Sequence, residues 1–169
     1  MIHSIYALPL PFVLFAMAFG VLVWAFLAER ISEKLQKPVN AVLAVLAVLA
    51  VIYVTLFRRQ SGKGEVFLMP FHSFAEARAQ KEMYRSMLMN VFLFTPLGVT
   101  LPFALPKKIR HPVGLTVFAA ALFSVGIEAV QYCEHLGRCE TDDVIMNVLG
   151  AAIGCLSFIL YRKNKKEKN

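Results

Sequence analysis

Charged residues are scarce in this chain of 169 residues. Asp, Glu, Lys and Arg together make up 17% of it, whereas apolar residues make up 58% and the mean hydropathy is +0.61. A soluble domain has roughly half apolar residues and about a quarter charged ones. A water-soluble fold of this length could not bury so many apolar side chains, so the composition predicts a membrane protein.

The apolar runs have few interruptions. A helix needs about 20 apolar residues to cross the hydrocarbon core, and five runs come close to that length. Only helices or closed barrels satisfy the backbone in lipid, and five long uninterrupted runs exclude a barrel. The sequence therefore predicts an all-α, polytopic bundle of five transmembrane helices, at about residues 7–28, 39–57, 88–105, 113–133 and 144–161.

No Lys or Arg precedes the first run, and the chain has neither an internal repeat nor a low-complexity linker. A cleavable signal peptide carries basic residues ahead of its apolar part, so we expect the first run to remain as an anchor. The chain is expected to form a single domain, 1–169, with one sizeable outer segment, 58–86. Within that segment, Phe67, Phe71 and Phe74 would anchor a short apolar stretch in the membrane interface.

Lys and Arg are unevenly distributed between the predicted loops. With the N-terminus outside, the inner segments carry eleven of them and the outer segments seven. Because cytoplasmic loops carry the excess of Lys and Arg, the predicted orientation is N-out and C-in. The largest basic cluster, 162–168, is typical of a stop-transfer tail that meets anionic lipid. The net charge of +7 is therefore no sign of a nucleic-acid partner.

Cysteine is rare. Cys155 lies in an apolar run and is expected to be a small packing residue. Cys133 and Cys139 would both lie at the outer end of the bundle, where an oxidising compartment could join them; two free thiols are the alternative. With His135 between them, these cysteines are too few to indicate a zinc site.

Strongly polar residues within the spans are few, and the predicted orientation places them in the outer half of the membrane. Such residues are costly in lipid and normally face the protein interior or a water-filled cavity. Spacings of four and three put Ser124, Glu128 and Gln131 on one face of the fourth helix. The other polar residues expected at this end are Arg58, Arg59, Asn90, Arg138, Asp142, Asp143 and Asn147.

The fifth helix carries a stripe of small and polar residues. Asp143, Asn147, Gly150 and Gly154 recur at helical spacing. Glycines on such a face allow a neighbouring helix to approach closely in lipid. In the third helix, Pro96 removes a backbone donor and can produce a kink.

Several of these residues also have a purely structural interpretation. Thr141 could cap the fifth helix, with Asp142 and Asp143 placed well against the helix dipole. Asn147 could form an interhelical hydrogen bond that fixes packing, and Arg59 could anchor lipid headgroups.

Glu128 is the hardest residue to explain by packing. An intramembrane carboxyl either pairs with a cation, such as Arg138 or Arg59, or stays protonated because burial disfavours its charged form. Either state is typical of a pocket that handles a ligand.

Three motifs carry a resemblance to a known family. They are NVFLFTPLG at 90–98, SVGIEAVQ at 124–131 and GRCETDDVIMNVLGAAIG at 137–154, with weaker echoes in VTLFRR at 54–59 and FLMPF at 67–71. In this order they make the chain resemble the VanZ-like family of multi-pass bacterial membrane proteins. The resemblance implies a place in the bacterial cytoplasmic membrane and an association with low-level resistance to lipoglycopeptides such as teicoplanin.

The motif match also implies a set of site residues. The chain departs from the family pattern between Arg138 and Asp142, where it is one residue shorter, and Glu140 stands where Asp is commoner; this leaves the partner of Arg138 open. The matched positions are Arg59, Asn90, Pro96, Gly98, Ser124, Glu128, Gln131, Arg138, Asp142, Asp143, Asn147 and Gly150.

Three functions fit these residues. The first is an enzyme acting at the outer leaflet on a lipid or lipid-linked cell-wall precursor, with Glu128, Asp143 or Asp142 as catalytic acid or base. The second is a non-catalytic module that binds the precursor or the lipoglycopeptide and limits access of the antibiotic to its target. The third and weakest is a lipid transporter or scramblase, for which five helices are few and no inverted repeat is present. The ligand-binding residues would be Arg59, Asn90, Ser124, Gln131, Arg138 and Asn147.

No cofactor is firmly indicated. A divalent cation bridging Asp142, Asp143 and Glu128 to a pyrophosphate would suit the oxygen ligands of these side chains. Two observations argue against an enzyme: the chain has no nucleophile motif, and no His lies among the polar residues of the predicted site. The sequence does not indicate an oligomeric state.

Overall fold

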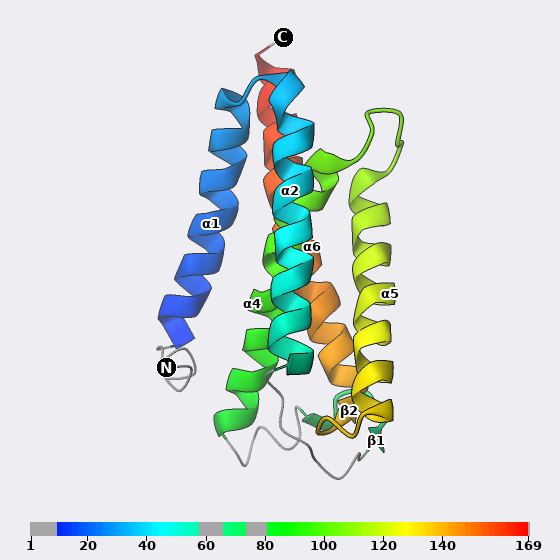
Figure 1. Ribbon diagram of the computed structural model, residues 1–169. Helices are drawn as coiled ribbons and strands as arrows, with labels where there is room; N and C mark the ends of the chain where they lie inside the picture. The colour runs from blue at the N-terminus through cyan, green and yellow to red at the C-terminus, as the bar shows by residue number, and fades with distance from the viewer. Residues whose placement is uncertain (1–9, 58–65, 74–80, 169) are drawn as a thin grey trace.

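The computed structural model of the protein describes residues 10–57, 66–73 and 81–168. Within these residues, five helices are long and apolar enough to cross a membrane (Figure 1). The predicted all-α, polytopic bundle is therefore confirmed. The helices are α1 (Leu10–Arg30), α2 (Glu33–Ile52), α4 (Lys81–Ala104), α5 (Pro112–Cys133) and α6 (Thr141–Glu167).

Several helices extend beyond the apolar runs from which they were predicted. α2 begins at Glu33, α4 begins at Lys81, and α6 continues through the basic tail to Glu167. An apolar run ends where contact with lipid ends, whereas a helix ends where its backbone hydrogen bonding stops. α4 also passes through Pro96 and Pro102 as one helix. α2 is followed directly by a π-helical segment, η1 (Tyr53–Phe57).

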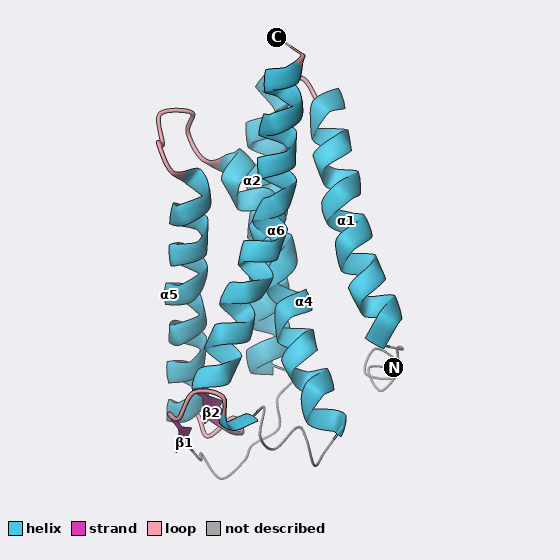
Figure 2. Ribbon diagram, turned by 180° about the vertical axis from the view of Figure 1, so that it is seen from behind, coloured by secondary structure: helices cyan, strands magenta, loops and turns pink. Residues whose placement is uncertain are grey.

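The centre of the bundle is the pair α4 and α6. Consecutive helices run in opposite directions, and α4 contacts each of the other four helices (Figure 1). Figure 2 shows α6 crossing α4, with α1 and α5 on either side. The side chains of Val51 and Phe94 are fully buried, while Phe15 and Phe118 point outward with 65% and 60% of their surface exposed. This distribution suits a bundle whose solvent is hydrocarbon.

Glycines allow α4 and α6 to approach with almost no space between their backbones. A Cβ atom placed on Gly150 would lie 2.1 Å from the carbonyl oxygen of Val91, and one on Gly98 would lie 2.0 Å from that of Ala151. Gly154 approaches α4 equally closely. The close helix contact predicted from the small residues is confirmed, and it fixes the depth of the polar residues of α6 relative to α4.

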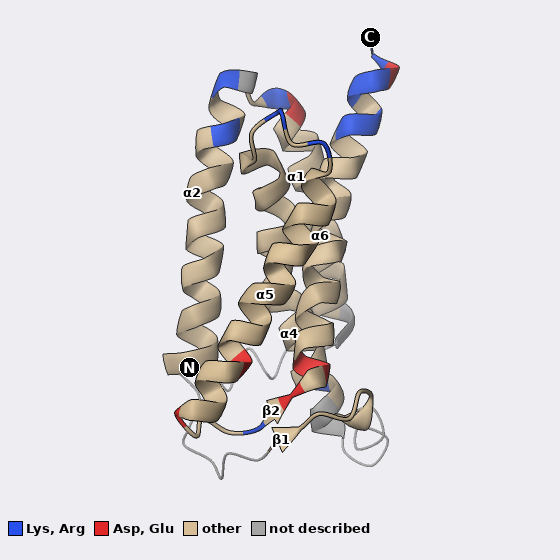
Figure 3. Ribbon diagram, turned by 90° about the vertical axis from the view of Figure 1, so that its right-hand side faces the viewer, with Lys and Arg blue, Asp and Glu red and all other residues tan. Residues whose placement is uncertain are grey.

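The two ends of the bundle differ in charge. Most of the described Lys and Arg residues lie at the end where α6 finishes, and most of the described Asp and Glu residues lie at the opposite end (Figure 3). At the acidic end, β1 (Val66–Phe67) pairs in parallel with β2 (Cys139–Glu140). This pairing brings the segment 66–73 onto the start of α6, where most of the predicted site residues lie.

Candidate functional site

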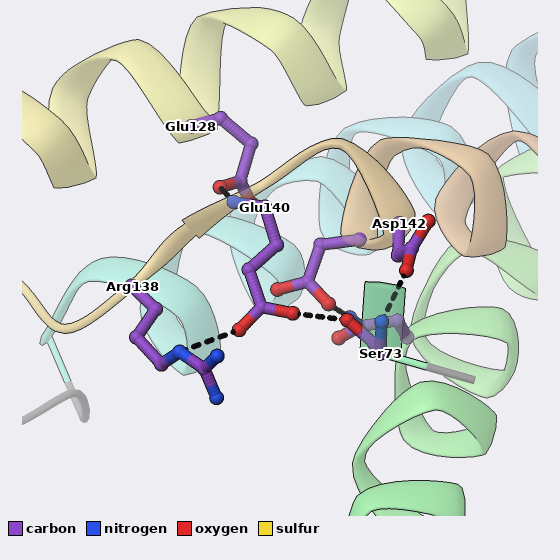
Figure 4. A network of polar contacts seen from close by, with 7 residues as sticks. Ser73, Glu128, Arg138, Glu140 and Asp142 are labelled. Carbon is purple, nitrogen blue, oxygen red and sulfur yellow. Dashed lines mark hydrogen bonds and ion pairs between the residues drawn. The ribbon is translucent and has the colours of Figure 1, made fainter. Parts of the chain in front are cut away.

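Four buried carboxylate residues form the centre of the polar end of the bundle, and we refer to them as the carboxylate cluster. Glu128, Glu140, Asp142 and Asp143 have 5%, 7%, 1% and 8% of their surface exposed. Glu128, Glu140 and Asp142 are labelled in Figure 4. Burying a charged group is costly unless it is paired and hydrogen-bonded, so the contacts of each carboxylate indicate what that carboxylate can do.

Asp142 holds the segment 66–73 in place. Its Oδ1 accepts a hydrogen bond from the backbone N–H of Phe71 at 2.6 Å, and its Oδ2 accepts one from that of Ser73 at 2.8 Å. Phe71 has a φ of 65°, a left-handed conformation that is uncommon for a bulky residue. With both carboxylate oxygens engaged by the backbone, Asp142 is placed to position this segment; its predicted catalytic role has no support in these contacts.

The structure does not support Thr141 as the cap of α6. The N-cap position is occupied by Glu140, which makes no side-chain capping bond. The hydroxyl of Thr141 instead donates to the carbonyl oxygen of Leu68 at 3.2 Å. Asp142 and Asp143 do lie in the first turn of the helix, where acidic side chains suit the helix dipole.

We predict that Asp142→Asn loosens the segment 66–73. An asparagine offers one acceptor and one NH2 donor where two backbone N–H groups now donate, so one of the two bonds is lost at a cost of about 1–3 kcal/mol. Hydrogen–deuterium exchange of residues 66–73 should accelerate by about tenfold or more, since 1.4 kcal/mol corresponds to tenfold. Glu134→Gln, a carboxyl-to-amide change at an exposed site, is the control; equal exchange in both variants would contradict the anchoring role.

Glu140 joins three parts of the site. Its Oε1 lies 3.1 Å from the Nε of Arg138, and its Oε2 accepts a hydrogen bond from the hydroxyl of Ser73 at 2.5 Å (Figure 4). The guanidinium carbon of Arg138 lies 4.1 Å from the centre of the Phe67 ring, a cation–π distance. Glu140 is therefore a partner of Arg138, which the sequence left open. The side chain of Arg138 keeps 31% of its surface exposed.

The segment 66–73 contains two of the three aromatic residues predicted as interfacial anchors, Phe67 and Phe71. Phe67 is half-buried, because its ring stacks on His72 with centroids 4.9 Å apart and also contacts Arg138; its role as an interfacial anchor remains a prediction. Phe71 is 61% exposed, and Leu68 and Met69 are each 72% exposed. The exposed surfaces of these three side chains are available to a membrane interface, while Phe74 lies outside the described residues.

Glu128 connects α5 with β2. Its Oε2 accepts a hydrogen bond from the backbone N–H of Glu140 at 3.0 Å. This contact is neither of the two states expected for Glu128 from the sequence, a cation partner or a proton, although it is compatible with both. It accounts for one of the two carboxylate oxygens of Glu128.

Amide side chains connect the remaining predicted residues. Asn90 on α4 donates to Asp143 Oδ1 at 2.6 Å, and Asn147 on α6 donates to Ser124 Oγ on α5 at 2.8 Å. The interhelical hydrogen bond expected of Asn147 is thus confirmed. The Oδ1 atom of Asn147 is buried and has no hydrogen-bond partner within the described part of the chain, so one acceptor remains open between α5 and α6.

Gln131 links α5 to the end of α2. Its Nε2 donates to the carbonyl oxygen of Thr55 at 3.0 Å, within η1. A π-helical turn leaves carbonyl groups without their usual helical partner, and such turns are frequent at functional sites. Arg58 and Arg59 come directly after η1 in the sequence and lie outside the described residues.

The structure brings most of the predicted site residues to one end of the bundle. Their catalytic and binding roles remain predictions. Sequence reasoning missed Ser73, Glu140 and Thr55 as members of the site, although Ser73 closely follows FLMPF and Thr55 lies within VTLFRR, the two weaker motif echoes. The predicted residues found at this end are Asn90, Ser124, Glu128, Gln131, Arg138, Asp142, Asp143 and Asn147.

Metal ligands and cysteines were further expectations at this end. Within residues 10–57, 66–73 and 81–168, no three His, Cys, Asp or Glu residues are arranged to hold a metal ion, so the described residues do not fit the bridging cation allowed by the sequence. Cys133, Cys139 and the buried Cys155 form no disulfide within the described residues.

These features define a class: polytopic membrane proteins with a buried carboxylate site at one end of a five-helix bundle. A family model described as VanZ/LLP1 matches residues 12–162, and the chain belongs to this family. The resemblance seen in the sequence motifs is thereby confirmed. Neither the curated proteins nor the solved structures contain a match to the chain.

Proposed function

We propose that this protein, in the bacterial cytoplasmic membrane with its N-terminus outside, binds the anionic headgroup of an envelope lipid or lipid-linked cell-wall precursor at the carboxylate cluster. In doing so it lowers susceptibility to lipoglycopeptides such as teicoplanin. The observation that carries this proposal is the burial of Glu128 and Asp143 within spanning helices. Intramembrane carboxylates are costly and typically belong to a site that handles a ligand.

The charges of the site suggest how a headgroup would be oriented. Buried carboxylates repel a phosphate, whereas an arginine binds one by parallel N–H bonds. Arg138 is partly exposed at the rim, with its guanidinium held by Glu140 and by the Phe67 ring. We infer that Arg138 contacts the phosphate, with Arg59 as a second candidate, and that hydroxyl or amine groups of the ligand reach inward to Glu128 and Asp143.

The exposed side chains of the outer segment support a ligand that arrives from the membrane. The segment 66–73 exposes the apolar side chains of Leu68, Met69 and Phe71. Asp142 holds this segment against α6. A lipid-linked molecule would find apolar surface for its chain beside polar groups for its head. A soluble headgroup alone would gain nothing from this arrangement.

The proposal includes two ways of lowering susceptibility. In the first, Glu128 or Asp143 acts as general acid or base and the bound precursor is chemically changed. In the second, the site binds the precursor or the antibiotic without chemistry and limits access of the drug to its target. A lipid transporter or scramblase is the least favoured role, because no described feature provides two alternating openings.

Teicoplanin susceptibility of a sensitive host tests the proposal. The host expresses wild type, Asp143→Asn or Arg138→Lys, with membrane levels matched by immunoblot. Wild type is expected to protect, and both variants should return the host towards the empty-vector level, because Asn removes the charge and Lys removes the planar, bidentate guanidinium.

Glu134→Gln is the control, since Glu134 is exposed at the end of α5. It should protect as wild type does. Failure of wild type to protect would refute the link to lipoglycopeptides. Full protection by both variants would instead show that these polar side chains serve packing.

A further inference from the structure

At the end of the bundle opposite the carboxylate cluster lies a cavity of about 800 Å³. It is bounded by the start of α2, the loop between α4 and α5, and the last turns of α6, and we call it the basic groove. Seven Lys and Arg residues line it, and its described lining contains no Asp or Glu. They include Lys34 and Lys37 on α2, Lys108 and Arg110 in the loop, and Arg162 on α6.

Three of these cations are not balanced by a carboxylate inside the described part of the protein. Lys37, Lys108 and Arg162 have no carboxylate partner within the described residues. Glu29, at the nearby end of α1, forms an ion pair with Lys168 and accepts a hydrogen bond from Asn164 at 2.9 Å. Like charges held close together repel, and a bound anion would relieve that repulsion.

Beneath the cations, the groove has a packed aromatic floor. Phe103 meets Phe158 edge-on with ring centroids 4.9 Å apart, and Tyr161 with centroids 5.3 Å apart. The Tyr161 hydroxyl donates to Gln36 Oε1 at 3.4 Å, so the floor is tied to α2. The Arg162 guanidinium lies over the Phe158 ring at 5.8 Å.

The position of the groove along the bundle matches the level of lipid headgroups. The apolar part of α6 ends at Tyr161, and the basic residues begin at Arg162. Figure 3 shows the Lys and Arg residues collected at this end, beyond the uncharged length of the helices. The groove therefore combines an apolar floor, suited to glycerol and acyl chains, with a cationic rim at phosphate height. Basic pockets between helices on the cytoplasmic side are typical of anionic-lipid sites.

We propose that the basic groove binds the phosphate of an anionic phospholipid from the leaflet on this face. The lipid phosphate lies between the cations of α2, the loop and α6, and its acyl chains continue along the outside of the bundle. This site is separate from the carboxylate cluster, and its occupancy does not depend on the function proposed for that cluster.

Native mass spectrometry of the full-length protein in mild detergent tests the proposal, with cardiolipin as the anionic probe and phosphatidylcholine as the neutral one. The test variant is the triple Lys37→Gln, Lys108→Gln, Arg162→Gln. The control triple is Arg30→Gln, Lys163→Gln, Lys166→Gln, which removes the same charge at the same end from exposed residues outside the groove lining.

Wild type should retain cardiolipin in preference to phosphatidylcholine. The test triple should lose at least about tenfold in cardiolipin affinity, since each near-surface cation contributes about 1 kcal/mol to attraction of anionic lipid. The control triple should keep most of that affinity. All six substituted side chains are exposed, and the elution volume on gel filtration checks that each variant is folded; the single variant Arg162→Gln replaces the triple if the triple aggregates.

Three results would overturn the proposal. An equal loss of cardiolipin affinity in both triple variants would mean that the basic end attracts anionic lipid diffusely and has no specific site. Equal retention of cardiolipin and phosphatidylcholine by wild type would mean that the groove has no preference for an anion. Displacement of cardiolipin by inorganic phosphate at an equal concentration would mean that the groove takes a soluble anion, not a lipid.

Discussion

Replacing Glu128 by glutamine is expected to remove most of the protection against teicoplanin while the bundle remains folded. Glutamine has the length of glutamate and keeps one oxygen that can accept the backbone N–H of Glu140, which now lies 3.0 Å from Glu128 Oε2. The variant loses the ability to ionise and the ability to transfer a proton. It therefore separates the chemistry of this buried side chain from its packing.

The size of the loss distinguishes the two ways of lowering susceptibility. General acid–base catalysis contributes about 10²–10⁴-fold to a rate, so a catalytic Glu128 predicts that the glutamine variant protects no better than an empty vector. A site that only binds should retain part of its protection, because the shape and one hydrogen bond survive. Lipid extracts of cells with wild type would contain a modified product in the first case alone.

Glu134→Gln is the matched control for this experiment. The two glutamates lie on the same helix end, and Glu134 is exposed whereas Glu128 is 5% exposed. We expect the control to protect fully at equal membrane level. Wild-type protection by Glu128→Gln would show that the charge of Glu128 is not required, and the proposed role of the cluster would then rest on Asp143 alone.

The bundle could be predicted from the sequence because lipid imposes a simple rule. Each span must be apolar and helical over the thickness of the membrane, and five runs obey that rule. The helix ends could not be predicted, since α2 starts at Glu33 and α6 continues to Glu167 through residues that lie beyond the apolar core. Helical hydrogen bonding does not require an apolar surface.

Part of the site followed from helix periodicity. Ser124, Glu128 and Gln131 share a face by spacing, and the structure buries all three. The contacts of Glu140 and Asp142 could not be predicted, because they join the segment 66–73 to residues about 70 positions away. The two strands that make this connection have two residues each. Such short strands are too short to show the alternation of apolar and polar residues by which a strand is recognised in a sequence.

A buried asparagine in the second helix also escaped prediction. Asn40 is fully buried and accepts a hydrogen bond from the indole N–H of Trp24 on α1 at 3.2 Å. In the sequence Asn40 lies at the start of an apolar run, where a polar residue is easily assigned to the membrane surface. Only the three-dimensional arrangement of α1 and α2 shows that it links the two helices.

The substitution Gly150→Ala is expected to destabilise the whole bundle. The added Cβ would lie 2.1 Å from the Val91 carbonyl oxygen, a backbone atom that cannot rotate away. Helices α4 and α6 would have to separate, which would disturb the neighbouring contact between Gly98 and Ala151. Overpacking of this kind costs about 1–3 kcal/mol and sometimes more. A fall in the thermal unfolding midpoint in detergent, with lower yield of monodisperse protein, is the expected measurement.

Gly126→Ala is the matched control, because it makes the same change in the middle of α5. A Cβ on Gly126 would meet no atom within 4 Å, and alanine is favoured over glycine in a helix by about 0.5–1 kcal/mol. This variant should be as stable as wild type or more stable. Gly126 also lies between Ser124 and Glu128, so a stable variant would show that this part of α5 tolerates substitution on its outer face.

Equal midpoints for Gly150→Ala and wild type would mean that α4 and α6 do not approach as closely as the structure places them. The depth of Asp143 and Asn147 relative to Asn90 would then have to be revised.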